Sequence, residues 1–323
     1  MKKLISLMLA VLLLAGLLSG CGSSVTNDNL HIVTTIFPAY DWVMQILGDT
    51  AADARVTMLL EGGVDLHSYQ PTADDMIAIS ACDLFIYVGG ESDSWVDDAL
   101  KNTSNEDMLV INLMDILGDA VVDEELAEGM EHDHHADGEE HHHEAAPDEH
   151  VWLSLRNAQT VCNSIVKQLT ALDPDNAAAY TANAQSYCTQ LRELDAAYSL
   201  VVEQAAFDTL LVADRFPFRY LAEDYGLNYY AAFAGCSAET EASFETIVFL
   251  ADKLDALGLG SVLVTESGDG SIASTVIAAT AAQNQTVLTL NSMQGVTGED
   301  VAKGASYLSI IGHNLEVLQK ALN

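Results

Sequence analysis

The chain has 323 residues, half of them hydrophobic, and is long enough for two domains with sizeable cores. Its formal net charge of −36 argues against a nucleic-acid partner, because phosphates would be repelled, and it favours the attraction of cations.

The first 20 residues are typical of a secretory signal peptide. Two lysines precede an apolar run over residues 4–18, which is short for a membrane span of about 20 residues. The sequence LSGC follows, ends at Cys21 and resembles a bacterial lipobox. This resemblance implies cleavage before Cys21, lipidation of its thiol and an extracytoplasmic protein anchored to the cell membrane, with residues 21–30 as a lipidated tether. An uncleaved signal anchor is the alternative.

Residues 31–175 are predicted to form an N-terminal α/β lobe. Stretches rich in β-branched residues alternate with stretches of helical apolar spacing, which indicates βαβ units and a mostly parallel sheet. The predicted strands are 31–37, 55–60, 84–90 and 108–113, and the predicted helices between them are 39–49 and 72–83.

Residues 120–149 interrupt this alternation. They have no apolar periodicity and are dominated by Asp, Glu and His, so we predict a disordered or loosely ordered insertion. Mixed tracts of this kind bind metal weakly through shifting ligands, or are simply solvated. The candidate weak metal ligands are His132, His134, His135, His141, His142 and His143.

A long helix is predicted to link two lobes. The helical pattern of residues 154–172 ends at the turn DPDN, and nearly thirty residues without Gly or Pro follow it. We assign the linking helix to residues 176–206, which would span about 40 Å. Cys162 and Cys188 flank the turn almost symmetrically, so they could form a disulfide or remain two buried free thiols.

Alternation of strands and helices resumes in residues 207–323, the predicted C-terminal α/β lobe. The fold class is therefore α/β, with two lobes of mostly parallel sheet joined by a long rigid helix. Ligand sites in such sheets lie beyond the carboxyl ends of the strands, so the cleft between the lobes is the first place to look. The predicted strands are 209–214, 227–233, 261–267 and 286–292, and the predicted helices are 218–226, 243–258, 271–283 and 307–322.

Two histidines occupy positions that favour ligand binding. His67 follows the second strand in a Gly-rich turn, and His150 begins the helical region after the insertion. Both would face the predicted cleft. A lone histidine is more often structural or solvated, and we assign His31 and His313 to that class.

The sequence resembles the substrate-binding lipoproteins of zinc and manganese ABC transporters, the metal-binding cluster A-I type. The resemblance runs from His31 to the C-terminus and rests on IVTTIFPAYD, GVDLHSYQPT, the His-rich insertion, DEHVWLSLRNA, YLAEDYGL and VTES in this order. It implies two Rossmann-like lobes joined by a rigid helix. It also implies capture of a divalent metal and its delivery to an ABC permease in the membrane.

The resemblance further implies that His67 and His150 bind the metal through neutral imidazole nitrogens. The other two ligand positions of the family fall on Arg215 and Asn291. Arginine has no acceptor and stays protonated, and Asn offers only a neutral carbonyl oxygen. The ligands of the C-terminal lobe are therefore altered.

Three ways of completing the metal site remain open. Asp214 could supply an oxygen from beside Arg215, or Glu266 could do so from the end of a strand. Alternatively, Arg215 could pair with Glu266 and leave a position for water or for a histidine of the insertion. We predict Glu266 and Asp214 as candidate metal ligands.

A binding protein is favoured over an enzyme, because the chain contains no HExxH, GxSxG, GxxxxGK[ST] or GxGxxG motif. Imidazole suits zinc better than manganese, so we expect zinc as the captured ion. The expected partners are this ion and a permease, with the protein as a monomer. A zinc-dependent hydrolase and a metal-binding surface adhesin are the alternatives.

Overall fold

The structure is a computed structural model that describes residues 29–130, 146–237 and 241–323. The predicted signal peptide and Cys21 lie outside these residues. So do the six histidines of the insertion, from His132 to His143. Within the described ranges, no helix is both long and apolar enough to cross a membrane.

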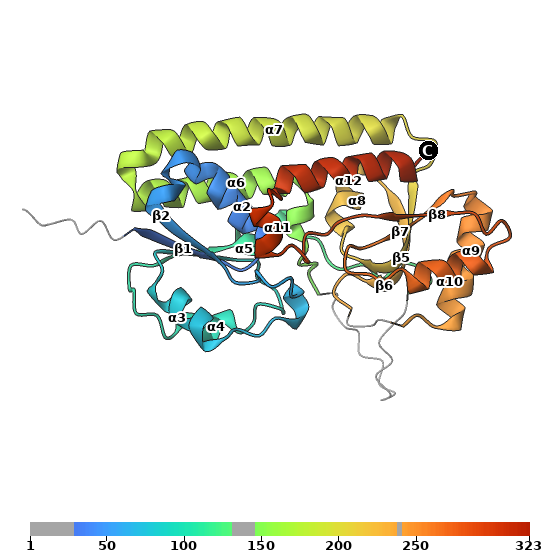
Figure 1. The fold of residues 1–323 in the computed structure, drawn as a ribbon, viewed down its shortest axis with the longest axis horizontal. Coiled ribbons are helices and arrows are strands. Elements are labelled where there is room, and N and C mark those ends of the chain that lie inside the picture. The colour runs from blue at the N-terminus through green and yellow to red at the C-terminus, as the bar shows by residue number, and fades with distance from the viewer. Residues whose placement is uncertain (1–28, 131–145, 238–240) are drawn as a thin grey trace, which may run out of the picture.

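Each lobe contains one four-stranded parallel sheet (Figure 1). The strand order is β2-β1-β3-β4 in the N-terminal lobe and β6-β5-β7-β8 in the C-terminal lobe. This arrangement confirms the predicted fold class. The strands are β1 (Leu30–Thr34), β2 (Ala54–Met58), β3 (Leu84–Tyr87), β4 (Leu109–Asn112), β5 (Thr209–Phe216), β6 (Asn228–Ala234), β7 (Ser261–Val264) and β8 (Thr286–Thr289).

Helices cover the sheets, and several of them begin where a side chain satisfies a first N–H group. Ser154 caps α6 by accepting from the Asn157 N–H, and Thr72 and Asp75 form a capping box at α3. Pro38 lies in the first turn of α2, where its missing N–H costs nothing. The helices are α2 (Phe37–Leu47), α3 (Ala73–Ala81), α4 (Val96–Leu100), α5 (Leu113–Leu117), α6 (Leu155–Leu172), α7 (Ala177–Glu203), α8 (Arg219–Tyr225), α9 (Phe244–Leu257), α10 (Ser271–Ala279), α11 (Gly298–Ala302) and α12 (Tyr307–Ala321).

The 27-residue helix α7 runs along both lobes (Figure 1). It packs against α2 and α6 of the N-terminal lobe and against α12 at its other end. At about 1.5 Å per residue it is roughly 40 Å long. Its position agrees with the predicted linking helix over residues 176–206.

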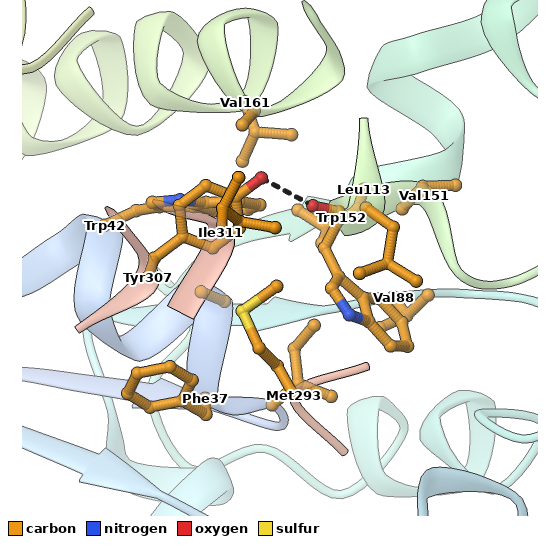
Figure 2. Close-up of a cluster of buried hydrophobic side chains, with 14 of the residues drawn as sticks. Phe37, Trp42, Val88, Leu113, Val151, Trp152, Val161, Met293, Tyr307 and Ile311 are labelled. Carbon is orange, nitrogen blue, oxygen red and sulfur yellow. Dashed lines mark hydrogen bonds between the residues drawn. The ribbon is translucent and has the colours of Figure 1, made fainter. Parts of the chain in front are cut away.

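One hydrophobic cluster is continuous across the two lobes, and a second lies within the C-terminal lobe alone. The rings of Trp42 in α2 and Tyr307 in α12 pack with centroids 5.2 Å apart. Figure 2 shows both near Trp152 and Met293. The Trp152 indole also donates a 2.8 Å hydrogen bond to the backbone oxygen of Ser292. Separating the lobes would expose this core.

The two ends of the insertion are ordered, which differs from the prediction for residues 120–149. Asp123 and Pro147 form an antiparallel bridge, and the Asp148 N–H donates to the Val122 oxygen at 2.9 Å. The Tyr220 hydroxyl of α8 donates to the Asp148 oxygen at 2.7 Å. Pairing between segments distant in sequence orders these polar ends without any apolar periodicity.

Cys162 and Cys188 are free thiols in the structure. They lie in the paired helices α6 and α7 and are both buried. Of the two alternatives left open by their spacing, the structure shows the free pair.

Candidate metal centre

His67 and His150 meet where the two lobes face one another. His67 lies in a short 3-10 helix, Leu66–Ser68, in the connection that follows β2. The carboxylate of Asp65 caps this turn by accepting from the His67 N–H at 2.9 Å. His150 directly precedes another 3-10 helix, Val151–Leu153, and is completely buried.

The separation of the two imidazoles fits a shared metal ion. The Nε2 atoms of His67 and His150 lie 3.2 Å apart. Two nitrogens bound to one tetrahedral zinc at about 2.0–2.1 Å would lie roughly 3.3–3.4 Å apart. Almost no rearrangement of the rings is therefore needed to bind one ion through both Nε2 atoms.

The carboxylate of Asp148 directs the lone pair of His150 Nε2 toward this point. A carboxylate can only accept, so the 3.0 Å contact between His150 Nδ1 and Asp148 Oδ1 places the proton of His150 on Nδ1. His67 Nδ1 lies 2.8 Å from the Ser92 hydroxyl and 3.4 Å from Glu149 Oε2. Such contacts fix the ring orientation of metal-binding histidines and raise their basicity.

The electrostatic environment keeps His67 neutral. Burial lowers the pKa of His67 to about 4, and the nearby His150 and Arg215 act in the same direction, while Asp65 and Asp148 oppose them. Metal ions bind the neutral form of imidazole. The side chain is thus held in the form that can accept a cation.

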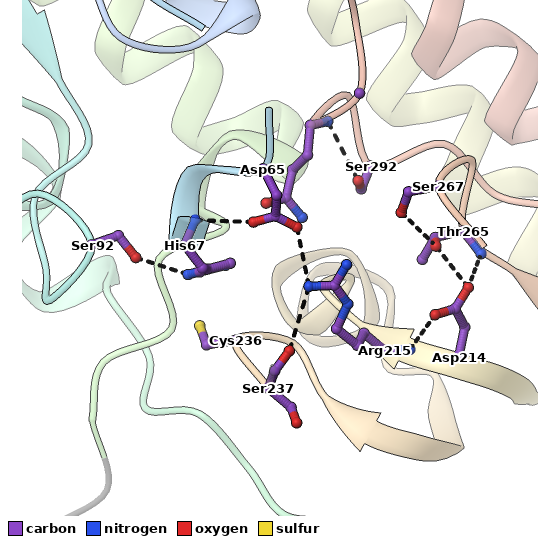
Figure 3. A network of polar contacts seen from close by, with 12 residues as sticks. Asp65, His67, Ser92, Asp214, Arg215, Cys236, Ser237, Thr265, Ser267 and Ser292 are labelled. Atoms are coloured by element: carbon purple, nitrogen blue, oxygen red, sulfur yellow. Dashed lines mark hydrogen bonds and ion pairs between the residues drawn. The ribbon is translucent and has the colours of Figure 1, made fainter. Parts of the chain in front are cut away.

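Cys236 is the third residue of this group. Among the described residues, one group of at least three potential ligands was found, and it consists of His67, His150 and Cys236. Their ligand atoms all lie within 4.8 Å of one another. Cys236 follows β6, and Figure 3 shows its sulfur directed toward His67. The sequence prediction missed this residue, because cysteines without CxxC spacing carry no metal signature.

The structure does not bring Asp214 into this group. Asp214 Oδ2 accepts from the N–H and the hydroxyl of Thr265, and Oδ1 accepts from the Arg215 N–H. The Arg215 guanidinium pairs with Asp65 at 3.1 Å across the two lobes (Figure 3), and not with Glu266 as one alternative expected. Asp214 Oδ2 therefore joins β5 to the end of β7, and Oδ1 is used within β5.

Glu266 is likewise engaged elsewhere. Its two oxygens accept from the N–H and hydroxyl of Ser292 and from the N–H groups of Gln294 and Gly295. The carboxylate therefore shapes the turn after β8. Asn291 accepts from the Met293 N–H within the same turn.

Gln294 is a further neighbour of the histidines that sequence reasoning missed. Its Nε2 lies 3.4 Å from His150 Nε2, and its Oε1 is buried without a hydrogen-bond partner among the described residues. Rotation of the amide by half a turn exchanges these atoms and turns the oxygen toward His150.

A cavity of about 330 Å³ adjoins His67. His67 and Cys236 line it together with the carboxylates of Glu91, Glu124 and Glu149. A cation would enter a pocket whose charged walls are acidic, which raises its local concentration.

A model of the family described as zinc-uptake complex component A, periplasmic (ZnuA), matches residues 32–321. The chain belongs to this family. Membership confirms the resemblance found in the sequence.

Two relatives illustrate the similarity to the ZnuA family. The chain is 31% identical over 314 residues to the high-affinity zinc uptake system protein ZnuA of Bacillus subtilis, covering 95% of this chain and 94% of that protein. It is 31% identical over 322 residues to the zinc-binding lipoprotein AdcA of Streptococcus pneumoniae, covering 99% of this chain. That match covers only 61% of AdcA, so the chain spans about three fifths of this longer relative.

Solved structures share the two-lobed ZnuA fold. The Zn(II)-bound ZnuA-like domain of Streptococcus pneumoniae AdcA superimposes with a TM-score of 0.69 and 27% identity, covering 91% of this chain and 99% of that one. The metal-dependent lipoprotein YcdH of Bacillus subtilis gives a TM-score of 0.72, also at 27% identity, with the same coverage.

Proposed function

We propose that this protein captures a zinc ion outside the cytoplasm and delivers it to an ABC-type permease in the membrane. One observation carries the proposal: His67 and His150 hold their Nε2 atoms 3.2 Å apart between the lobes of a ZnuA-family chain. Two imidazoles suit zinc better than manganese, which prefers oxygen ligands. Names of relatives, such as the zinc-binding lipoprotein AdcA, support the same ion.

The proposal includes membrane attachment of the mature chain, as a monomer, through lipidated Cys21. The LSGC motif supports this attachment, and AdcA is a lipoprotein by name. A single acyl chain binds membranes only weakly, so stable anchoring requires more than one chain.

The His-rich segment would gather metal near the pocket. Its histidines at 132, 134, 135, 141, 142 and 143 offer many weak ligands. Ala146 and Pro147, which follow the segment, line the same cavity as His67. This adjacency supports a role in presenting ions to the tight site.

The alternatives, a zinc-dependent hydrolase and a surface adhesin, each predict an activity that a transport protein lacks. Membership of a zinc-uptake family favours neither. Zinc-dependent turnover of an ester or peptide would support the hydrolase, and altered attachment with unchanged growth under zinc limitation would support the adhesin.

Zinc titration by calorimetry tests the proposal. The mature chain should bind one zinc tightly and several weakly, and deletion of residues 131–145 should remove most weak sites. This deletion spares Glu124 and Asp148, which are bound to the ordered frame. The double variant His67→Ala and His150→Ala should lose the tight site, while His313→Ala, at an exposed position of α12, should keep it. A tight site that survives the double substitution would refute the assignment.

A further inference from the structure

The cysteine beside the two histidines has a fixed backbone. The Cys236 N–H donates a 2.8 Å hydrogen bond to Glu124 Oε1, in the ordered flank of the insertion. Gly235 precedes it and packs against the His150 ring, where an added Cβ would lie 3.0 Å from Cε1. The Cys236 backbone is therefore held close to His150 by its hydrogen bond to Glu124 and by the close packing of Gly235.

We propose that Cys236 binds the captured ion as a thiolate and completes a donor set of two nitrogens and one sulfur. This inference rests on the proposed function, since it names a ligand of the same site. A tetrahedral zinc with a Zn–S bond of about 2.3 Å would place the sulfur roughly 3.6 Å from each nitrogen. The atoms of the group lie within 4.8 Å, so a shift of the Cys236 sulfur by about an ångström suffices.

Binding of a cation to Cys236 releases the thiol proton. Burial raises the pKa of Cys236, and the carboxylates of Glu124, Asp148 and Glu149 raise it further, so the metal-free protein holds a neutral thiol. The arriving cation forms a bond to sulfur as the S–H bond breaks, and the proton leaves to solvent. The thiolate therefore forms as the cation binds.

The C-terminal lobe then supplies a ligand from a different strand than the family pattern does. That pattern places a ligand at Arg215, on β5, where this chain has a cation paired with Asp65. Arg215 lies opposite Phe233 of β6, three residues before Cys236. The proposed ligand of the C-terminal lobe therefore follows β6 and does not lie on β5, the strand to which β6 is hydrogen-bonded.

A sulfur ligand narrows the range of ions that the site can hold. Thiolate and imidazole together favour zinc and other soft or borderline ions over manganese, which prefers carboxylate and carbonyl oxygen. The site should therefore reject manganese even at a large excess.

Cobalt(II) provides a direct probe of the sulfur. The full mature chain, reduced and anaerobic, should bind one cobalt tightly with a thiolate-to-cobalt charge-transfer band in the near ultraviolet. Cys236→Ser should abolish this band and weaken zinc binding at least tenfold. Cys188→Ser removes a thiol of α7 outside the site and should leave both unchanged.

X-ray absorption of the zinc-loaded wild type detects a Zn–S bond directly. Because it needs no substitution, its result does not depend on whether Cys236→Ser folds. A Zn–S distance of about 2.3 Å beside Zn–N distances of about 2.0–2.1 Å is the expected result. Tight binding of one zinc or cobalt without sulfur would overturn this inference and leave the proposed function standing. Absence of any tight site would overturn both.

Discussion

Tyr307, the first residue of the last helix, donates a 2.7 Å hydrogen bond to the backbone oxygen of Trp152, two residues after His150. Its own N–H donates to Asp41 in α2. The C-terminal helix α12 is thus bonded to two segments of the N-terminal lobe, and one of these carries a proposed metal ligand.

Removing the Tyr307 hydroxyl should destabilise the protein. Tyr307→Phe leaves the buried oxygen of Trp152 without a partner, so we expect a loss of about 1–3 kcal/mol in the free energy of unfolding. Denaturant titration of the metal-free protein measures it. Tyr40→Phe is the matched control, because no hydrogen bond of its hydroxyl is found among the described residues. Equal stability of both variants would contradict the role of this bond.

Binding of zinc should change the overall shape very little. The lobes share the core around Trp42 and Tyr307, and α7 braces both, so opening a hinge would expose apolar surface. X-ray scattering profiles with and without zinc should superimpose. A marked fall in the radius of gyration on adding zinc would show that the lobes close instead.

The carboxylate behind His150 should strengthen metal binding. Asp148→Asn keeps an oxygen that can accept from Nδ1 but removes the charge, so zinc affinity should fall by about 10–100-fold. Competition with a zinc-binding dye measures this affinity. Asp97→Asn, at an exposed position of α4, should leave it unchanged. Unaltered affinity in Asp148→Asn would mean that its charge does not act on the ion.

Close packing at Gly235 should make even a methyl group harmful there. An added Cβ would lie 2.8 Å from the Phe216 oxygen and 3.0 Å from His150 Cε1, and the backbone oxygen cannot yield. Gly235→Ala should therefore displace the imidazole and lower zinc affinity by roughly tenfold or more. Gly260→Ala, where nothing lies within 4 Å of the added Cβ, should bind zinc like the wild type. Normal affinity in Gly235→Ala would show that the ring can shift freely.

Asp93 predicts a pH dependence of stability. Burial raises the pKa of Asp93 to about 6, although the N–H groups of Val88 and Gly89 donate to its Oδ2. Because the folded pKa exceeds the ordinary value of 3.8, the stability from this group is fully present below about pH 4 and is lost as pH rises through about 6.

Asp93→Asn isolates this effect, because an amide does not titrate. The free energy of unfolding of the wild type, relative to that of Asp93→Asn, should fall by roughly 3 kcal/mol between pH 4 and pH 7. Denaturant titrations of the metal-free proteins at several pH values measure the difference. A difference that stays constant or rises with pH would contradict the raised pKa.

Local patterns predicted most of the fold. Period-two and period-3.6 spacing located the eight strands and the long helix, and strand ends marked His67 as a residue of the cleft. The ordered flanks of the insertion were not predictable in this way, since Asp123 meets Pro147 only through non-local pairing.

Dependence on non-local contacts also explains why Cys236, the third residue of the group, was not predicted. Cys236 stands alone in its sequence neighbourhood, and only the folded chain brings its thiol to His67 and His150. Glu266 ends a strand as a ligand would, but its oxygens are taken by backbone N–H groups of the turn after β8. Composition and spacing do not reveal which acceptors the backbone will use.

The common strand order of the two sheets gives the metal centre an internal pseudo-symmetry. β2 and β6 are the second strand of each lobe and the edge of each sheet, and they hold matching places beside β1 and β5. His67 comes from the connection after β2, and Cys236 follows β6. The proposed site thus uses the same structural position twice, once with nitrogen and once with sulfur, and His150 adds a second ligand from the N-terminal lobe.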